Sequence, residues 1–407
     1  MPHVAIRPYV IDVADAEIED LRRRLHDTRW PTPLDGTGWD DGTDLAFLKR
    51  LVDYWQYGFS WAEQQERLNR LPHFKAAIDG HDIHFIHARG KGPAPFPLVL
   101  THGWPGAFTE FERALPLLTD PASHGGSAED AFDVVIPSLP GFGFSGPPPR
   151  AGTSARTVAT LWTTLMQALG YPRFGAQGGD IGAAVGMWLG ALHPEHVVGL
   201  HLNYIPGAFR ASPGDADAPL SEEEQAFLAR RAAFMDAEGA YSLLQGTKPQ
   251  TLAFSLTDSP TGLAAWLVEK FRSWSDCDGD VERAVSMDAL LTDISLYWFG
   301  RTIDASLRMY KENRLAPLQF APGQRVLPPL GYAQFPRELP TPPRSYVERV
   351  FTVQRWTAMP AGGHFAALER PADLVEDIRA FFRPLRQAAA SPAALGPDVG
   401  SATLHGS

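Results

Sequence analysis

The chain has 407 residues, of which 44% are hydrophobic and 20% charged, a composition typical of a globular protein with room for two to three domains. Its formal net charge of −11 argues against a surface that binds nucleic acid. A single cysteine, Cys277, excludes an internal disulfide framework and a multi-cysteine metal cluster. The sequence has neither an apolar run of about 18 residues nor a secretory signal. We therefore expect a cytoplasmic protein without a membrane span.

The N-terminal part of the chain is predicted to be mostly helical. Apolar residues recur at helical spacing over 15–29, 44–54 and 61–71. Residues 81–88 alternate polar and apolar side chains, a pattern typical of a half-buried strand. We assign residues 1–95 to an N-terminal segment that wraps around the remainder.

Short apolar runs that each end in a loop signal follow this segment. The runs lie at 97–100, 132–137, 173–177 and 197–203. Helical stretches at 154–169 and 181–193 separate the later ones. Apolar strands that alternate with helices predict an α/β fold with a mostly parallel sheet covered on both faces.

Between about residues 208 and 315 strand patterns vanish and helical patterns dominate, at 222–237, 262–274 and 287–298. Strand-like runs return at 324–328 and 350–359, and an amphipathic helix is predicted at 371–382. We therefore expect a core formed by 96–207 and 318–386, interrupted by a helical cap at 208–317. Residues 387–407 are rich in Ala, Pro, Gly and Ser and are predicted to form a flexible tail.

The sequence Gly178-Gly179-Asp180-Ile181-Gly182 follows a predicted strand and opens a predicted helix. This is the setting of a nucleophile elbow, where glycines are needed because side chains would collide with the neighbouring strand and helix. An aspartate with a pKa of about 4 is ionised at neutral pH and needs no base to attack. Such attack suits an sp³ carbon that bears a leaving group. A glycine-rich turn in which Asp180 merely caps the helix is the alternative.

A histidine and an acid occupy the later positions that such a hydrolase requires. His364 follows the last predicted strand, and Glu338 follows the strand before it. With Asp180 as nucleophile, His364 would deprotonate a water that hydrolyses the ester, and Glu338 would orient the imidazole. Taken singly, His364 could be an ordinary loop histidine and Glu338 a solvated loop residue. Their joint order is much more specific than either.

The loop His102-Gly103-Trp104-Pro105 follows an early predicted strand. The backbone N–H groups of Trp104 and Ile181 are our candidates for an oxyanion hole. A cis bond before Pro105 is a further hypothesis, and an ordinary Gly/Pro turn is the alternative.

Over about residues 4–385 the chain resembles the microsomal-type epoxide hydrolases. The motifs that carry the resemblance are Arg7-Pro8-Tyr9, Trp55 with Ser60-Trp61, His102-Gly103-Trp104-Pro105, Gly178-Gly179-Asp180, Phe335-Pro336 and Gly362-Gly363-His364-Phe365. The resemblance implies an α/β-hydrolase core with Asp180 as nucleophile, His364 as base and Glu338 as acid. It also implies that two cap tyrosines, matched here by Tyr241 and Tyr310, hydrogen bond to the epoxide oxygen. From the residues alone both tyrosines would be interpreted as surface or core side chains.

The predicted function is the hydrolysis of a hydrophobic or aryl epoxide to a vicinal diol, with the epoxide and water as partners and without a cofactor or metal. A homodimer is left open. The alternatives are a haloalkane dehalogenase, which would need N–H donors around a halide, and a catalytically silent protein that binds a small ligand. Two other patterns are set aside. No helix can start after the Gly-rich stretch 141–146, because Pro147-Pro148-Pro149 follows it, and His84 should face away from His81 and His87 on a strand.

Overall fold

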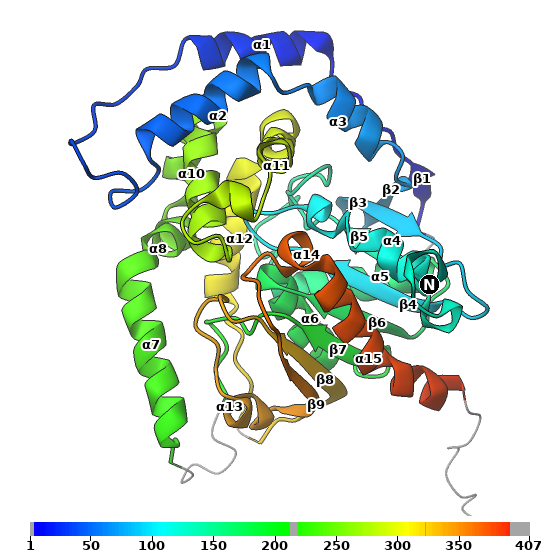
Figure 1. Ribbon diagram of the computed structural model, residues 1–407. Helices are drawn as coiled ribbons and strands as arrows, with labels where there is room; N and C mark the ends of the chain where they lie inside the picture. The colour runs from blue at the N-terminus through cyan, green and yellow to red at the C-terminus, as the bar shows by residue number, and fades with distance from the viewer. Residues whose placement is uncertain (1–3, 212–218, 322, 391–407) are drawn as a thin grey trace, which may run out of the picture.

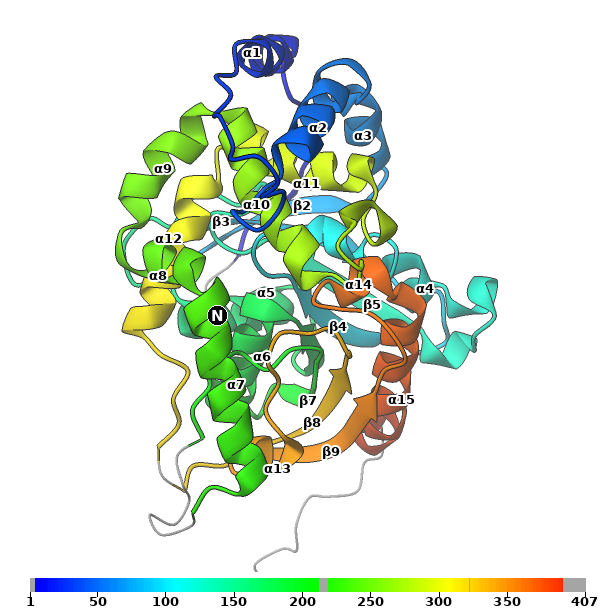
Figure 2. The same ribbon diagram turned by 60° about the vertical axis from the view of Figure 1, so that its left-hand side comes forward.

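Residues 4–211, 219–321 and 323–390 are described by the computed structural model drawn in Figures 1 and 2. Within them, one nine-stranded sheet has the order β1-β2-β3-β5-β4-β6-β7-β8-β9. The strands are β1 (Ile6–Pro8), β2 (His73–Ile78), β3 (His81–Ala88), β4 (Phe96–Thr101), β5 (Phe132–Pro137), β6 (Phe174–Gly178), β7 (Val197–Leu202), β8 (Val326–Gln334) and β9 (Phe351–Ala358). All pairings from β5 to β9 are parallel, which confirms the predicted mostly parallel α/β sheet.

The N-terminal segment has two parts with different roles. Strands β1, β2 and β3 extend the core sheet by antiparallel pairing, and of these only β3 was predicted. Its helices lie over the cap rather than around the core (Figure 1). These helices are α1 (Asp15–His26), α2 (Leu45–Tyr57) and α3 (Trp61–Leu68).

The cap follows β7 and precedes β8, as predicted. Its helices are α7 (Glu222–Glu238), α8 (Ala240–Thr247), α9 (Pro249–Asp258), α10 (Pro260–Trp274), α11 (Met287–Gly300) and α12 (Ile303–Leu315). Helices α7, α10 and α11 match predicted ones, whereas α8, α9 and α12 have no predicted counterpart. In Figure 1, α10 and α11 lie between the N-terminal helices and the core.

Hydrogen bonds fasten the N-terminal helices to the cap. The Thr43 hydroxyl, just before α2, donates to the Ala265 carbonyl of α10 at 2.7 Å. The Trp55 indole donates to the Ser295 hydroxyl of α11 at 3.2 Å in a buried position. The N-terminal segment therefore holds the cap in place, in addition to the two chain connections between the cap and the sheet.

Helices cover both faces of the core sheet. They are α4 (Leu115–Thr119), α5 (Ala155–Ala168), α6 (Asp180–Leu192), α13 (Arg344–Glu348), α14 (Ala366–Glu369) and α15 (Pro371–Ala390), with 3₁₀ turns η1 (Phe108–Phe111), η2 (Pro121–His124) and η3 (Ala128–Asp130), whereas η4 (Val281–Arg283) lies between α10 and α11 of the cap. On β7, a side chain at Gly199 would meet Leu385 of α15, whereas Leu200 reaches α6 at Gly190. Because successive strand residues face opposite sides, α6 and α15 cover opposite faces (Figure 2).

Helix α15 is longer than predicted. It continues through residues 387–390, so the predicted flexible tail is wrong for these four residues. The remainder of that tail, 391–407, lies outside the described residues. None of the described helices combines the length and the apolarity needed to cross a bilayer.

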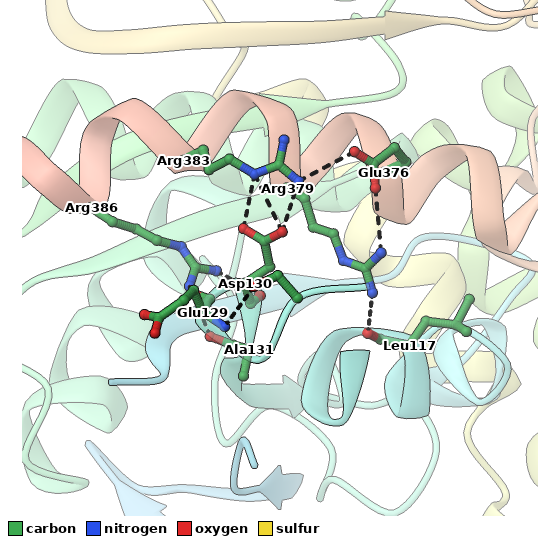
Figure 3. Close-up of polar contacts among 9 residues, drawn as sticks. Leu117, Glu129, Asp130, Ala131, Glu376, Arg379, Arg383 and Arg386 are labelled. Carbon is green, nitrogen blue, oxygen red and sulfur yellow. Dashed lines mark hydrogen bonds and ion pairs between the residues drawn. The ribbon is translucent and has the colours of Figure 1, made fainter. Parts of the chain in front are cut away.

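Three arginines of α15 hold it against the start of β5 (Figure 3). Arg383 binds the buried Asp130 carboxylate through Nε at 2.9 Å and Nη2 at 2.7 Å. Arg386 donates to the backbone carbonyls of Glu129, Asp130 and Ala131, and Arg379 donates to that of Leu117. The hydrogen bonds from Arg383 lower the pKa of Asp130, so the carboxylate stabilises the docked helix in its charged form.

We expect Asp130→Ala to lower the free energy of unfolding by about 2 to 3 kcal/mol, because a buried charge-assisted pair is lost. Glu66→Ala is the matched control, since it removes an exposed ion pair with Arg70 and should cost less than about 0.5 kcal/mol. Urea denaturation followed by circular dichroism measures both. Equal effects of the two substitutions would contradict the assigned role of Asp130.

Candidate active site

Asp180 lies at the tip of a tight turn between β6 and α6. Its φ angle is +46°, in the left-handed region that few residues other than glycine adopt. A Cβ at Gly182 would lie 1.9 Å from the Thr101 carbonyl oxygen of neighbouring β4, and one at Gly178 would lie 2.5 Å from the Gly182 backbone. The glycine requirement predicted for this turn is confirmed. The turn presents Asp180 at the carboxyl edge of the sheet.

The Asp180 carboxylate is held by the loop that follows β4. The backbone N–H of Trp104 donates to its Oδ1 at 2.8 Å. The Trp104–Pro105 peptide bond is cis, as hypothesised. Ile181 lies in the first turn of α6, where backbone N–H groups have no partner within the helix. The Trp104 N–H thus contacts the carboxylate, Ile181 is the next residue after Asp180, and the oxyanion-hole role of both groups stays a prediction.

His364 and Glu338 come together with Asp180 from separate loops. His364 lies between β9 and α14, and Glu338 lies between β8 and α13. The imidazole Nδ1 is 2.7 Å from Glu338 Oε1, and Nε2 is 3.5 Å from Asp180 Oδ2. The Glu338 side chain is completely buried. The imidazole is therefore oriented by one carboxylate and directed at the other.

The charge of the imidazole depends on both carboxylates. Burial alone would lower the pKa of His364, but the Glu338 and Asp180 carboxylates together raise it well above its usual range. The raised pKa favours the imidazolium while Asp180 is ionised. Any reaction that neutralises Asp180 removes one of the two negative charges, which lowers the pKa of His364 and favours the neutral imidazole, the form that can accept a proton.

Tyr241 and Tyr310 lie on cap helices α8 and α12, next to each other, and both contact the Trp104 indole. The Tyr241 ring stacks on that indole at 5.5 Å, and the Tyr310 ring meets it edge-on at 5.7 Å. The two tyrosine rings are 5.8 Å apart. Burial, with a smaller effect of the Asp180 charge, raises the pKa of Tyr241 well above its usual range, and burial raises that of Tyr310. Both phenols therefore stay protonated and able to donate.

Three residues near the carboxylate had no place in the sequence analysis. Trp274, the last residue of α10, accepts a hydrogen bond from the His364 backbone N–H at 2.9 Å and packs its ring edge-on against the imidazole at 5.1 Å. Glu110 and Asn203 line a cavity shared with Asp180 and His364. Glu110 could have been noticed as a lone carboxyl between Phe108 and Phe111, whereas Trp274 and Asn203 carried no signal.

A second cavity, of about 740 Å³, lies elsewhere, between the loop that precedes α2 and the outer side of α10. Its lining includes Leu34, Leu48 and Trp266 but none of the predicted catalytic residues. The larger cavity is therefore separate from the candidate active site around Asp180.

The patterns set aside earlier have structural roles. His84 is fully buried and pairs with His73 at 2.9 Å and with the Ser138 hydroxyl at 2.9 Å. The Gly-rich stretch 141–146 forms a turn, and the next helix, α5, starts only at Ala155.

Comparison with known proteins agrees with this geometry. The family described as "Epoxide hydrolase N terminus" matches residues 6–111, and the one described as "alpha/beta hydrolase fold" matches residues 97–276. A relative from Stigmatella aurantiaca is 46% identical over 382 residues, which cover 94% of this chain and 86% of the relative. Epoxide hydrolase 1 of Oryctolagus cuniculus is 38% identical, with 93% of this chain and 88% of the relative covered. The chain belongs to the epoxide hydrolase family.

Solved structures of epoxide hydrolases share the fold. The juvenile hormone epoxide hydrolase of the silkworm Bombyx mori superposes with a TM-score of 0.84 at 30% identity, covering 95% of this chain and 96% of that one. The Aspergillus niger epoxide hydrolase gives a TM-score of 0.81 at 30% identity, with 94% and 97% covered. The α/β-hydrolase fold and the resemblance inferred from the motifs are confirmed, and the protein is a hydrolase enzyme of this family.

We expect Gly182→Ala to lower the free energy of unfolding by at least about 4 kcal/mol or to abolish soluble expression, because the new methyl group would enter the Thr101 carbonyl. Gly186→Ala, one turn later in α6, is the matched control. Its Cβ would meet only the Leu202 Cδ2 atom at 3.3 Å, so its stability should stay within about 1 kcal/mol of the parent. Thermal unfolding measures the stability of both variants. A Gly182→Ala variant as stable as Gly186→Ala would contradict the close packing assigned to this turn.

Proposed function

We propose that this epoxide hydrolase converts a hydrophobic or aryl epoxide to a vicinal diol through a covalent ester on Asp180. The observation that carries the proposal is the arrangement around that carboxylate. Its Oδ2 lies 3.5 Å from the Nε2 of an imidazole that Glu338 orients, and Trp104, which packs against two buried phenols, donates to its Oδ1. This arrangement supplies a nucleophile, a base and acids for the leaving oxygen.

In the first step, a carboxylate oxygen of Asp180 attacks one epoxide carbon, and the C–O bond of the ring at that carbon breaks. Negative charge develops on the leaving oxygen. Tyr241 and Tyr310 donate hydrogen bonds to it, and one of them transfers its proton. The product is a hydroxyalkyl ester of Asp180 with one phenolate.

In the second step, water attacks the Asp180 carbonyl carbon while the N–H groups of Trp104 and Ile181 stabilise the oxyanion. One water proton passes to His364 Nε2 and then to the departing diol oxygen. The other water proton stays on the regenerated Asp180 carboxyl group, which then transfers it to the phenolate and restores the tyrosine. The two steps therefore balance with epoxide and water as the reactants.

Aromatic side chains favour a hydrophobic substrate. Trp104, Tyr241, Trp274 and Tyr310 pack against one another beside the carboxylate, with ring centroids 5.2 to 6.3 Å apart. An aryl or other apolar group of the epoxide would pack against these rings between core and cap. We place this activity in the cytoplasm.

A single turnover in ¹⁸O-water tests the covalent route. Enzyme in excess over styrene oxide should give a diol without label, because the new hydroxyl oxygen comes from Asp180. The label should enter the protein at Asp180 and appear in diol only in later turnovers, as mass spectrometry of diol and of the Asp180 peptide will record. Direct labelling of the first diol would instead indicate attack by bulk water.

Tyr241→Phe and Tyr310→Phe should each slow ester formation by about 100-fold, because one donor to the developing charge is lost. The double variant should be slower still. Tyr57→Phe is the control, since Tyr57 is exposed and its hydroxyl lies outside the site. Stopped-flow measurement of Trp fluorescence under single-turnover conditions follows this step.

The same variants separate the dehalogenase alternative. The indole Nε1 atoms of Trp104 and Trp274 are buried and have no hydrogen-bond partner among the described residues, so halide-binding N–H donors are present in the site. Unchanged release of bromide from 1-bromohexane by both tyrosine variants, with no diol from any epoxide, would favour that alternative. Saturable ligand binding without either product would favour a silent binding protein.

A further inference from the structure

Beside Asp180 and His364 lies a cavity of about 10 Å³, which we call the water-sized cavity. A site for one water needs roughly 10 to 15 Å³ and two to four polar partners. Four polar side chains contribute to the lining, together with seven apolar or glycine residues. These four are Asp180, His364, Glu110 and Asn203. The cavity thus has the size and polarity for the reacting water, whereas a substrate would not fit.

Glu110 lies in η1, at the end of the loop that follows β4, and its carboxyl group is held closely by the chain. A Cβ at Gly106 would lie only 1.6 Å from its Oε1 atom. Within the described residues, no group forms a hydrogen bond or ion pair with this carboxyl group. The side chain is partly accessible, and the water-sized cavity is one of the surfaces it lines.

An unpartnered carboxyl group in this place is costly for folding. Burial, and then the nearby Asp293 carboxyl group, raise the pKa of Glu110 well above its usual range. Transfer of such a group from water without a new hydrogen bond is unfavourable. No described hydrogen bond or ion pair of the Glu110 carboxyl group compensates for its partial removal from water.

The other polar residues of the cavity already have a task in the reaction or a described hydrogen-bond partner. His364 Nε2 must take the proton of the attacking water, and Asp180 carries the carbon under attack. Asn203 Oδ1 already accepts a hydrogen bond from Gln177 Nε2 at 2.8 Å. A water that donates one hydrogen to His364 needs a partner for its other hydrogen if its lone pair is to face the ester carbon. Glu110 is the side chain left for this task.

We propose that Glu110 is a water-positioning residue, whose carboxyl oxygen accepts a hydrogen bond from the water that hydrolyses the Asp180 ester. The inference rests on the proposed function and refines its second step. Attack breaks the Cγ–O bond to the alkyl group, and the protons move as described above, with His364 as the acceptor. Glu110 holds the second hydrogen of the water and does not itself change protonation during the step.

Glu110→Leu should leave ester formation within about threefold of the parent and slow ester hydrolysis by about 100-fold, as a misplaced reactant does. Intact-protein mass spectrometry after mixing with styrene oxide should then show the ester adduct accumulating. Glu110→Gln keeps an acceptor oxygen at the same distance along the side chain and should restore hydrolysis to at least a tenth of the parent rate. Glu112→Leu, in the same loop but paired with Arg67, should show no adduct.

Thermal unfolding of the same variants separates positioning from a structural role. Replacement of a partly accessible carboxyl group that has no described partner by an apolar side chain should keep or raise the melting temperature of Glu110→Leu. A lower melting temperature with both steps slowed alike would overturn the proposal, as would a Glu110→Leu variant that forms no adduct. So would Glu110→Gln if it behaved like Glu110→Leu. If the parent enzyme itself forms neither ester nor diol, the proposed function fails instead.

Discussion

The site depends on holding a carboxyl side chain at a backbone position that proteins rarely use. The left-handed conformation of Asp180 costs on the order of 1 to 3 kcal/mol, and the surroundings must enforce it. Enforcement comes from close backbone contacts: Gly182 rests on the β4 carbonyl, and Gly103 is so close to Asp180 that a Cβ there would lie 2.2 Å from the Asp180 Cβ. The rest of the arrangement, from the Trp104 N–H to the imidazole, is built around where this turn places two oxygen atoms.

The charges around that turn connect the two chemical steps. While Asp180 is ionised, it and Glu338 raise the pKa of His364, and a protonated imidazole cannot act as a base. Formation of an ester neutralises Asp180 and leaves Glu338 as the remaining partner. In the proposed mechanism, His364 therefore becomes available as a base once the ester has formed. The partly buried phenols of Tyr241 and Tyr310 fit the same proposal, because their raised pKa keeps them protonated for the step that needs a donor.

The elements that the sequence predicted well are those whose local pattern coincides with their tertiary role. Strands that are buried on both faces appear in the sequence as apolar runs. The glycines around Asp180 indicate a tight turn, because a side chain at these positions would collide with the neighbouring backbone. Strand β1, of three residues, is too short to show alternation, and the break at Lys248 and Pro249 interrupts the apolar pattern between α8 and α9. Tyr241 lies on one of these pieces, which is why its assignment needed the family resemblance.

The N-terminal segment belongs to two structural layers at once. Its strands are hydrogen bonded into the core sheet, while its helices bond to α10 and α11 from the opposite side. The cap is therefore not an exchangeable module bounded by residues on either side of the insertion. A chimaera that takes its cap from a relative would have to import the matching N-terminal helices as well, since the Thr43 and Trp55 donors lie 222 and 240 residues before the cap acceptors that they bind.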